Sequence, residues 1–281
     1  MHSRELGLVL AKQLLDVEDL HYGLWDADLE LKLGNMALAQ QRYNEMLIAQ
    51  LPGPDGGVRV LDIGCGTGQL LRQLLDRGYR ADGVVPARDL ADAVRLRLAD
   101  RPGYRSHLSE CRFEDLPAEQ FRRLYDVALF SESFQYIPLS ASLPKLREIL
   151  KPGGLLVICD FFKTEALGDG AAGDRSFGGG HPLGEFYAAM RQTPFALVKD
   201  EDITRRMSPN LDLVNDLLMR RIKPAGLTLG RYLHERYPLL TRLVLRVLRR
   251  KLEKLLREYE AELSAVHFFS SPPWGRTPSR P

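Results

Sequence analysis

The chain has 281 residues, of which 44% are hydrophobic and 27% charged, and its formal net charge is +2. This composition is that of a folded globular protein, so it excludes a disordered or collagen-like chain, and the small net charge gives no reason to expect a nucleic-acid partner. Three widely spaced cysteines without metal-ligand spacing, and no apolar run long enough for a membrane span or a signal peptide, lead us to expect a cytoplasmic protein without a metal.

Apolar residues recur at helical spacing over 5–20 and 36–51, which predicts an N-terminal helical cap over residues 1–52. Over residues 53–205, short apolar runs alternate with amphipathic stretches, a pattern typical of a parallel sheet with helices on both faces. The expected strands are Arg59–Ile63, Ala81–Val85, Asp126–Phe130 and Leu155–Phe161, with a weaker one between Tyr104 and Arg112. The expected helices lie near Gln69–Arg77, Leu90–Ala99 and Leu143–Leu150, and Lys151–Gly154 should end the last helix and start a strand.

The last third of the chain is expected to complete the sheet and to add helices. Phe195–Thr204 and Val266–Trp274 are a sixth and a seventh expected strand, so we predict an α/β fold with a Rossmann-like, seven-stranded, mostly parallel sheet. Residues 206–265 would form a C-terminal helical insertion, as a lid or an interface, and residues 266–281 the last strand and a flexible tail. Leu239–Leu263 is basic and amphipathic, which fits packing on the domain, peripheral membrane contact or a homodimer seam.

The sequence "VLDIGCGTGQLL", Val60 to Leu71, predicts a cofactor loop between the first core strand and a helix. Gly64, Gly66 and Gly68 are spaced G-x-G-x-G, whereas the dinucleotide-binding fingerprint is G-x-G-x-x-G. In a doubly wound sheet this loop lies at the carboxyl ends of the strands, where ligands bind. Asp62 would repel a pyrophosphate but suits a cationic ligand, so the residues favour S-adenosylmethionine over a nicotinamide dinucleotide.

Three segments in order, "VLDIGCGTG", "YDVALFSESFQYI" and "LPKLREILKPGGLLVICDFF", resemble the signatures of class I S-adenosylmethionine-dependent methyltransferases over roughly residues 20 to 205. The resemblance implies that Asp62 and the three glycines hold the methionine half of the cofactor. The second strand of most relatives ends in a ribose-binding acid, but Val85 stands there, and Asp82 or Asp89 are the alternatives. Phe113 would flank the adenine, Glu114 or Asp115 would accept from its amino group, and Ser131 completes the expected cofactor set.

The leader "LHYGLWD", Leu20 to Asp26, resembles that of methyltransferases acting on lipids, quinones, terpenoids and other small natural products. In those relatives the leader folds over the cofactor, which would place Tyr22 near the cofactor's carboxylate and let His21 and Trp25 help close the pocket. The plainer interpretation is an aromatic cluster that only packs in the core.

The acceptor site is expected directly after the fourth strand, in "FSESFQYIP". The Asn/Asp-Pro-Pro-Tyr tetrad of many nucleic-acid and protein methyltransferases is absent there, which argues against nucleobase or glutamine acceptors. Glu132 and Tyr136 become candidate catalytic residues, and His181, in a glycine-rich loop, is a candidate base. A satisfied buried carboxylate and a surface histidine are the structural alternatives.

The function predicted from these residues is methyl transfer from S-adenosylmethionine to a small, apolar acceptor at O, C or N. A non-catalytic S-adenosylmethionine-binding or scaffold protein is the alternative, kept open by Val85. A nicotinamide-dependent oxidoreductase is disfavoured by the glycine spacing.

Overall fold

The computed structural model describes residues 19, 21–101, 108–163 and 180–217, and five single positions between 220 and 235. Its main sheet has five strands, all parallel, in the order β3-β2-β1-β4-β5. The strands are β1 (Arg59–Ile63), β2 (Arg80–Val84), β3 (Leu108–Ser109), β4 (Tyr125–Ser131) and β5 (Leu150–Cys159). The order reverses between β1 and β4, and in doubly wound sheets ligands bind at such a switch point, outside the carboxyl ends of the strands.

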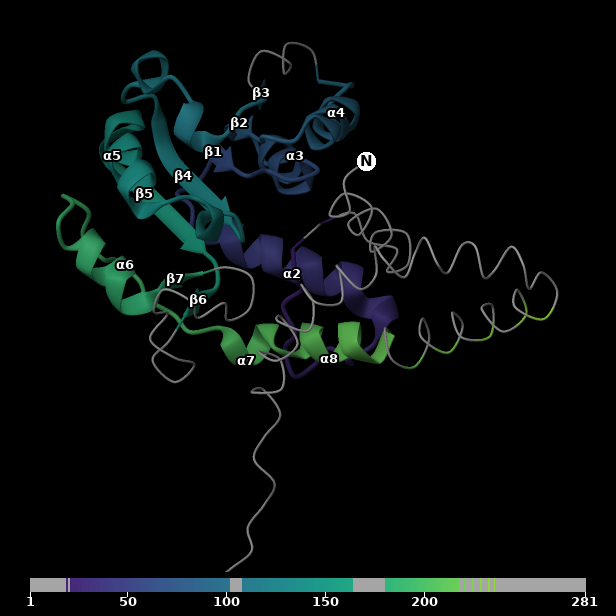
Figure 1. The fold of residues 1–281 in the computed structure, drawn as a ribbon. Helices are drawn as coiled ribbons and strands as arrows, with labels where there is room; N and C mark the ends of the chain where they lie inside the picture. The colour runs from purple at the N-terminus through teal and green to yellow at the C-terminus, as the bar shows by residue number, and fades with distance from the viewer. Residues whose placement is uncertain are drawn as a thin grey trace, which may run out of the picture.

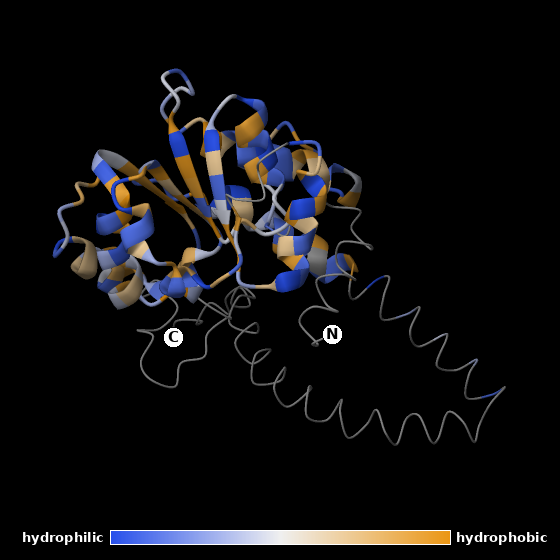
Figure 2. Cartoon of the chain, turned by 90° about the horizontal axis from the view of Figure 1, so that it is seen from above, coloured by the Kyte–Doolittle hydropathy of each residue, from blue (hydrophilic) through white to orange (hydrophobic). Residues whose placement is uncertain are grey.

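Helices cover both faces of the sheet (Figure 1). α2 (Met36–Ile48), α3 (Gln69–Asp76) and α4 (Arg88–Arg97) belong to the apolar cluster of one face, and α5 (Leu139–Ile149) to that of the other. Along β4, Val127 and Leu129 join the first cluster whereas Ala128 and Phe130 join the second, as the period of two requires. Figure 2 shows the resulting pattern, with apolar strands between helices that carry polar segments.

Short elements gather beyond the carboxyl ends of the strands, on the side toward which the arrows of β4 and β5 point (Figure 1). They are β6 (Phe162–Lys163) and β7 (His181–Pro182), which pair in parallel, and the helices α6 (Leu183–Met190), α7 (Thr204–Met207) and α8 (Pro209–Asp216). A third apolar cluster joins Trp25, Met36, Ala39 and Leu213, so α8 packs on α2 through the leader segment.

The predicted α/β class, the parallel sheet and four of its core strands are confirmed, but the predicted strand over 195–204 is wrong. These residues form no strand, and Leu197 and Val198 are 70% and 83% exposed. Their composition is typical of a strand, but in the described structure they pair with no other strand. The described sheet therefore has five strands. The expected strand over 266–274 and the expected helix over 239–263 lie outside the described residues, as does the expected helix over 5–20 except for Asp19.

α5 ends at Ile149 and β5 begins at Leu150, so the predicted change from helix to strand is confirmed, slightly earlier than Lys151–Gly154. Gly153 has the left-handed φ of 78° that the sequence suggests, but it lies inside the strand. The register of β4 with β5 jumps from Tyr125–Leu150 to Val127–Leu155, so the glycine pair forms an irregularity of the β-bulge kind. No helix in the described parts of the chain is long and apolar enough to cross a bilayer.

Candidate functional site

The glycine-rich loop follows β1 at the switch point, and its geometry explains why two of its residues are glycines. A Cβ on Gly64, which has a φ of 79°, would overlap the side chain of Ser133 in the segment after β4. A Cβ on Gly66, which has a φ of 54°, would meet no atom within 4 Å. Gly64 therefore lets two strand ends approach each other, whereas Gly66 borders open space, as a loop that touches a ligand requires.

Asp62, near the end of β1, is the most unusual polar group of this site. It is 1% exposed, and neither carboxylate oxygen has a hydrogen-bond partner in the described part of the chain. Burial, with a further contribution from Asp19, raises the pKa of Asp62 to about 7, while His21 opposes the rise. Burying a carboxylate without a partner costs free energy unless a ligand binds to it, and a cationic or hydrogen-donating ligand would meet this requirement.

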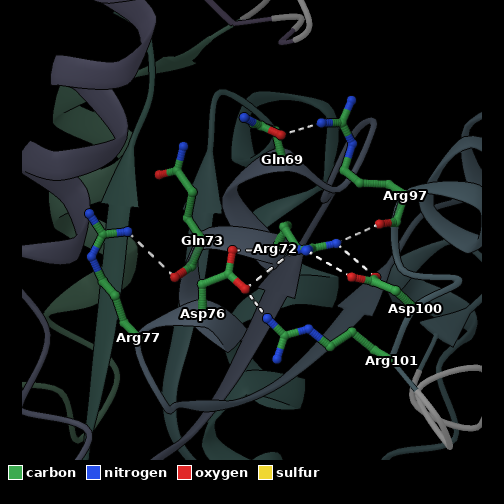
Figure 3. A network of polar contacts seen from close by, with 8 residues as sticks. All are labelled: Gln69, Arg72, Gln73, Asp76, Arg77, Arg97, Asp100 and Arg101. Atoms are coloured by element: carbon green, nitrogen blue, oxygen red, sulfur yellow. Dashed lines mark hydrogen bonds and ion pairs between the residues drawn. The ribbon is translucent and has the colours of Figure 1, made fainter.

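A polar network on α3 and α4 holds the other end of the loop (Figure 3). The Arg97 guanidinium donates from Nε to the carbonyl oxygen of Thr67 at 2.9 Å and also contacts the side chain of Gln69. Arg72 donates in turn to the carbonyl oxygen of Arg97 at 3.0 Å and pairs with Asp100 at 2.8 Å. The loop is thus fixed from outside by charged groups, and its inner side stays open at Gly66.

Glu132 directly follows β4 and has a strained backbone, with a φ of 52° in a residue other than glycine. Its amide donates to the carbonyl oxygen of Cys159 at 2.9 Å, and its Oε1 accepts from the amide of Tyr22 at 3.1 Å. Burial raises the pKa of Glu132 to about 7, against the effects of His21 and of the Tyr22 amide. Strain and a perturbed carboxyl at one residue are typical of functional positions.

The leader brings His21 and Tyr22 to these carboxyl groups. The imidazole of His21 stacks on the ring of Tyr43 with 4.5 Å between centroids. Its Nδ1 lies 2.8 Å from the carbonyl oxygen of Tyr22 and its Nε2 lies 3.3 Å from Oδ2 of Asp19. Both ring nitrogens thus face oxygen atoms, an arrangement that favours the doubly protonated ring, and the pKa of His21 is raised by Asp19 although its burial acts in the opposite direction.

Asp160, the first residue after β5, belongs to the same edge and was missed in the sequence. Its carboxylate accepts from the amides of Gln135 at 3.0 Å and Phe161 at 2.8 Å, and burial raises its pKa to about 6. An acid directly after a parallel strand is a signal that could have identified it, because the carboxyl ends of parallel strands share one edge.

The other two predicted catalytic residues lie around Phe134. His181 places Nε2 3.2 Å from the carbonyl oxygen of Phe134, and its ring meets the Phe134 ring edge-on. Tyr136 is 70% exposed. The contacts of His181 thus lie at Phe134, whereas the Glu132 carboxyl contacts the leader.

The residues expected around the ribose and adenine are mostly structural in their contacts. Val85 is buried at 1% exposure, and its amide donates to the carbonyl oxygen of Ser109. Phe113 is buried against Phe130, and the ammonium group of Lys145, which lies over the Phe113 ring, also donates to the carbonyl oxygen of Glu114. Two of the remaining candidates also have partners within the protein, since Ser131 donates to the Tyr43 hydroxyl and Asp82 pairs with Arg59. The side chains of Asp89 and Asp115 are exposed.

In the described part of the chain, no group of three or more His, Cys, Asp or Glu side chains is arranged to hold a metal ion.

Comparison with known proteins agrees with this geometry. The family model of a methyltransferase domain matches residues 61–156. The chain is 29% identical over 145 residues to a ubiquinone biosynthesis O-methyltransferase of Leptothrix cholodnii, a match that covers 51% of this chain and 60% of the relative. It is 31% identical over 109 residues to the sterol 4-C-methyltransferase strm-1 of Caenorhabditis elegans, which covers 37% of this chain and 32% of the relative.

Solved structures share the fold over a longer stretch. The geranyl diphosphate C-methyltransferase of Streptomyces coelicolor, crystallised with S-adenosyl-L-homocysteine, covers 73% of this chain and 81% of its own, with a TM-score of 0.59 at 20% identity. The [4+2]-cyclase SpnF covers 83% of this chain and 90% of its own, with a TM-score of 0.61 at 22% identity. The match, the motifs and this fold thus identify residues 61–156 as a methyltransferase domain of the class I S-adenosylmethionine-dependent type.

Proposed function

We propose that this protein transfers the methyl group of S-adenosylmethionine to a small acceptor molecule. The observation that carries the proposal is Asp62, a fully buried carboxylate without a hydrogen-bond partner in the described residues, beside a glycine loop that borders open space. A ligand with an ammonium group and a sulfonium would provide the cationic partner that this carboxylate lacks. When bound, S-adenosylmethionine supplies a methyl group that its sulfonium already activates.

The chain's own residues would then position the reactants and exclude water. Asp62, Gly64, Gly66 and Gly68 would hold the amino-acid half of the cofactor, with Tyr22 and Ser131 beside it. Phe113, Glu114 and Val85 would lie along the adenosine half, where Val85 is a core residue whose side chain offers no acceptor to the ribose hydroxyls. Glu132 would align the acceptor or remove its proton, with Tyr136 and His181 farther out as acceptor contacts.

The acceptor proposed here is small and largely apolar. The relatives support this class, because their names concern ubiquinone biosynthesis, sterols and geranyl diphosphate. The aromatic residues near Glu132 support it as well: the rings of Tyr22 and Phe161 meet edge-on, and Phe134 contacts His181 and Phe186. A domain division at residues 52, 205 and 265, a cytoplasmic setting and a homodimer or membrane contact through Leu239–Leu263 are further proposals from the sequence. A seven-stranded sheet would need two strands from outside the described residues, because residues 195–204 form none.

Calorimetric titration with S-adenosylmethionine tests the cofactor assignment. Gly66→Val should abolish binding, because valine strains a residue with a φ of 54° and fills the space beside the loop. Gly56→Val is the matched control: Gly56 has a φ of 82° and open surroundings, but it precedes β1 at the opposite edge of the sheet, so binding should persist. Unchanged affinity in a folded Gly66→Val protein would contradict the assignment.

Mass-spectrometric screening of apolar alcohols, phenols, alkenes and amines with the wild-type protein tests methyl transfer itself. A product heavier by one methylene equivalent supports the proposal. Binding of the cofactor without any methylated product would favour the alternative of a non-catalytic or differently reacting protein, and efficient methylation of RNA or intact protein would overturn the acceptor class.

A further inference from the structure

Asn210 of α8 is a fully buried amide, at 0% exposure, whose polar atoms are all used. Its Oδ1 accepts from the amide of Gly23 and from the indole Nε1 of Trp25, both at 2.9 Å. Its Nδ2 donates to the carbonyl oxygens of Gly23 and Met207, both at 2.6 Å. One side chain thus joins the leader to the segment that connects α7 and α8.

Further contacts hold the same junction tightly. The amide of Trp25 donates to the carbonyl oxygen of Arg206 at 2.8 Å, and the amide of Leu24 donates to that of Ala39 in α2. Gly23 approaches α2 so closely that a Cβ would come within 2.5 Å of the Cβ of Ala39. Residues 23–25 therefore have one position relative to α2 and α8 in this packing, and Asn210 makes the largest number of bonds to them.

The residues just before this junction reach the candidate site. Tyr22 donates its amide to Glu132, and His21 lies close enough to Asp62 and Glu132 to shift the pKa of both carboxyls. A change in the position of Gly23 would move these two residues directly, since only one peptide bond separates Gly23 from Tyr22. Asn210 therefore affects the site indirectly, through the backbone of Gly23 to which it is hydrogen-bonded.

We propose that Asn210 is a positioning residue that fixes the leader beside Asp62 and Glu132, so that the α7–α8 segment sets the affinity for the amino-acid half of the cofactor. The inference rests on the proposed function. It assigns to the start of the C-terminal helical segment a role in cofactor binding, although Asn210 itself contacts only the leader and Met207.

Two ligands separate positioning from general stabilisation. S-Adenosylhomocysteine carries the amino-acid half, whereas 5′-methylthioadenosine has the same nucleoside without it. Asn210→Ala should weaken binding of S-adenosylhomocysteine about 10-fold or more, the scale of a lost buried hydrogen-bond set that aligns one ligand half. Binding of 5′-methylthioadenosine should change less than about 2-fold. Calorimetry on the full chain, well below the melting temperature, gives both constants.

Asp26→Asn is the matched control at the same junction. It weakens the half-exposed ion pair of Asp26 with Arg206 but leaves every bond of Asn210, so both ligands should bind as in the wild type. Asn210→Asp serves if the alanine variant does not fold: it keeps the two accepting bonds, loses the donations to Gly23 and Met207, and should show the same ligand-selective loss. Equal weakening of both ligands, or no weakening of either in folded variants, overturns the inference. Failure of the wild type to bind S-adenosylhomocysteine overturns the proposed function instead, and this inference with it.

Discussion

Glu132 combines a left-handed backbone with a buried carboxyl group, and either feature alone costs stability. A residue other than glycine at a φ of 52° costs about 1–2 kcal/mol, and burial disfavours the charge. Three groups compensate in part: the amide of Tyr22 and the imidazole of His21 favour the carboxylate, and the carbonyl of Cys159 fixes the Glu132 amide. Their arrangement holds a carboxyl group whose pKa is near neutrality at the end of β4.

Glu132→Gln isolates the charge of this residue, because it keeps the shape and the backbone strain. If Glu132 removes a proton from the acceptor, kcat should fall about 10²-fold or more while the cofactor dissociation constant changes little. In the wild type, kcat should rise with pH through about 7, because the carboxyl group must ionise to act as a base. The glutamine variant should lose this rise.

Glu148→Gln provides the control. Glu148 lies on α5 and pairs with Arg122 at the surface, so this variant should match the wild type in kcat and in its pH profile. A Glu132→Gln enzyme with wild-type turnover would remove the residue from catalysis and leave the strain without a catalytic explanation.

At the scale of elements, the sequence predicts those parts whose pattern is local. β1 agrees with the predicted Arg59–Ile63 because both its short apolar run and its flanking glycines are short-range signals. The bulge in β5 could not be predicted, since Gly153 with a left-handed φ fits a turn and a bulge equally well. The contacts of Asn210 with the leader join residues that lie 185 and 187 positions apart in sequence, so no local pattern could reveal them, and Asp160 was accessible only through the order of the strands.

The packing of the leader on α2 gives a test at this scale. Gly23→Ala should destabilise the fold by about 1–3 kcal/mol, because the new Cβ would lie 2.5 Å from the Cβ of Ala39. Ala39→Gly alone should cost about 1 kcal/mol, as a glycine inside a helix does. The double variant should be more stable than the sum of the two losses predicts, since removal of one methyl group makes room for the other.

Urea unfolding of the four proteins measures this coupling energy. Strictly additive losses would show that the leader does not approach α2 as closely as the structure indicates.

At the scale of the whole molecule, the site concentrates groups that retain protons in the folded state. The pKa values of Asp62 and Glu132 are raised to about 7 and that of Asp160 to about 6, all chiefly by burial. His21 shifts in the same upward direction. Four carboxyl groups nearer the surface shift in the opposite direction, so their pKa values are lowered in the folded state: Asp28, Asp126, Glu201 and Asp202. Their contribution is lost only as the pH falls through about 4 and below, so the two groups of residues act in different pH ranges.

The free energy of unfolding of the cofactor-free protein should therefore decrease as the pH rises from about 5 to 8. Between these values the native state binds more protons than the unfolded state, so the derivative of the unfolding free energy with pH is negative. At about 1.4 kcal/mol per pKa unit, the three raised carboxyl groups, if they titrate independently, together predict a loss of about 6–7 kcal/mol over this range. Asp62→Asn removes one of the proton-binding sites and should flatten the curve, and urea unfolding at several pH values measures both slopes.

S-Adenosylmethionine should stabilise the protein more at pH 8 than at pH 5, because its positive charge favours the ionised carboxylates. A flat or rising stability curve between pH 5 and 8 in the cofactor-free protein would show that these carboxyl groups are solvated or paired, and would contradict the unpartnered state of Asp62 on which the cofactor site is built.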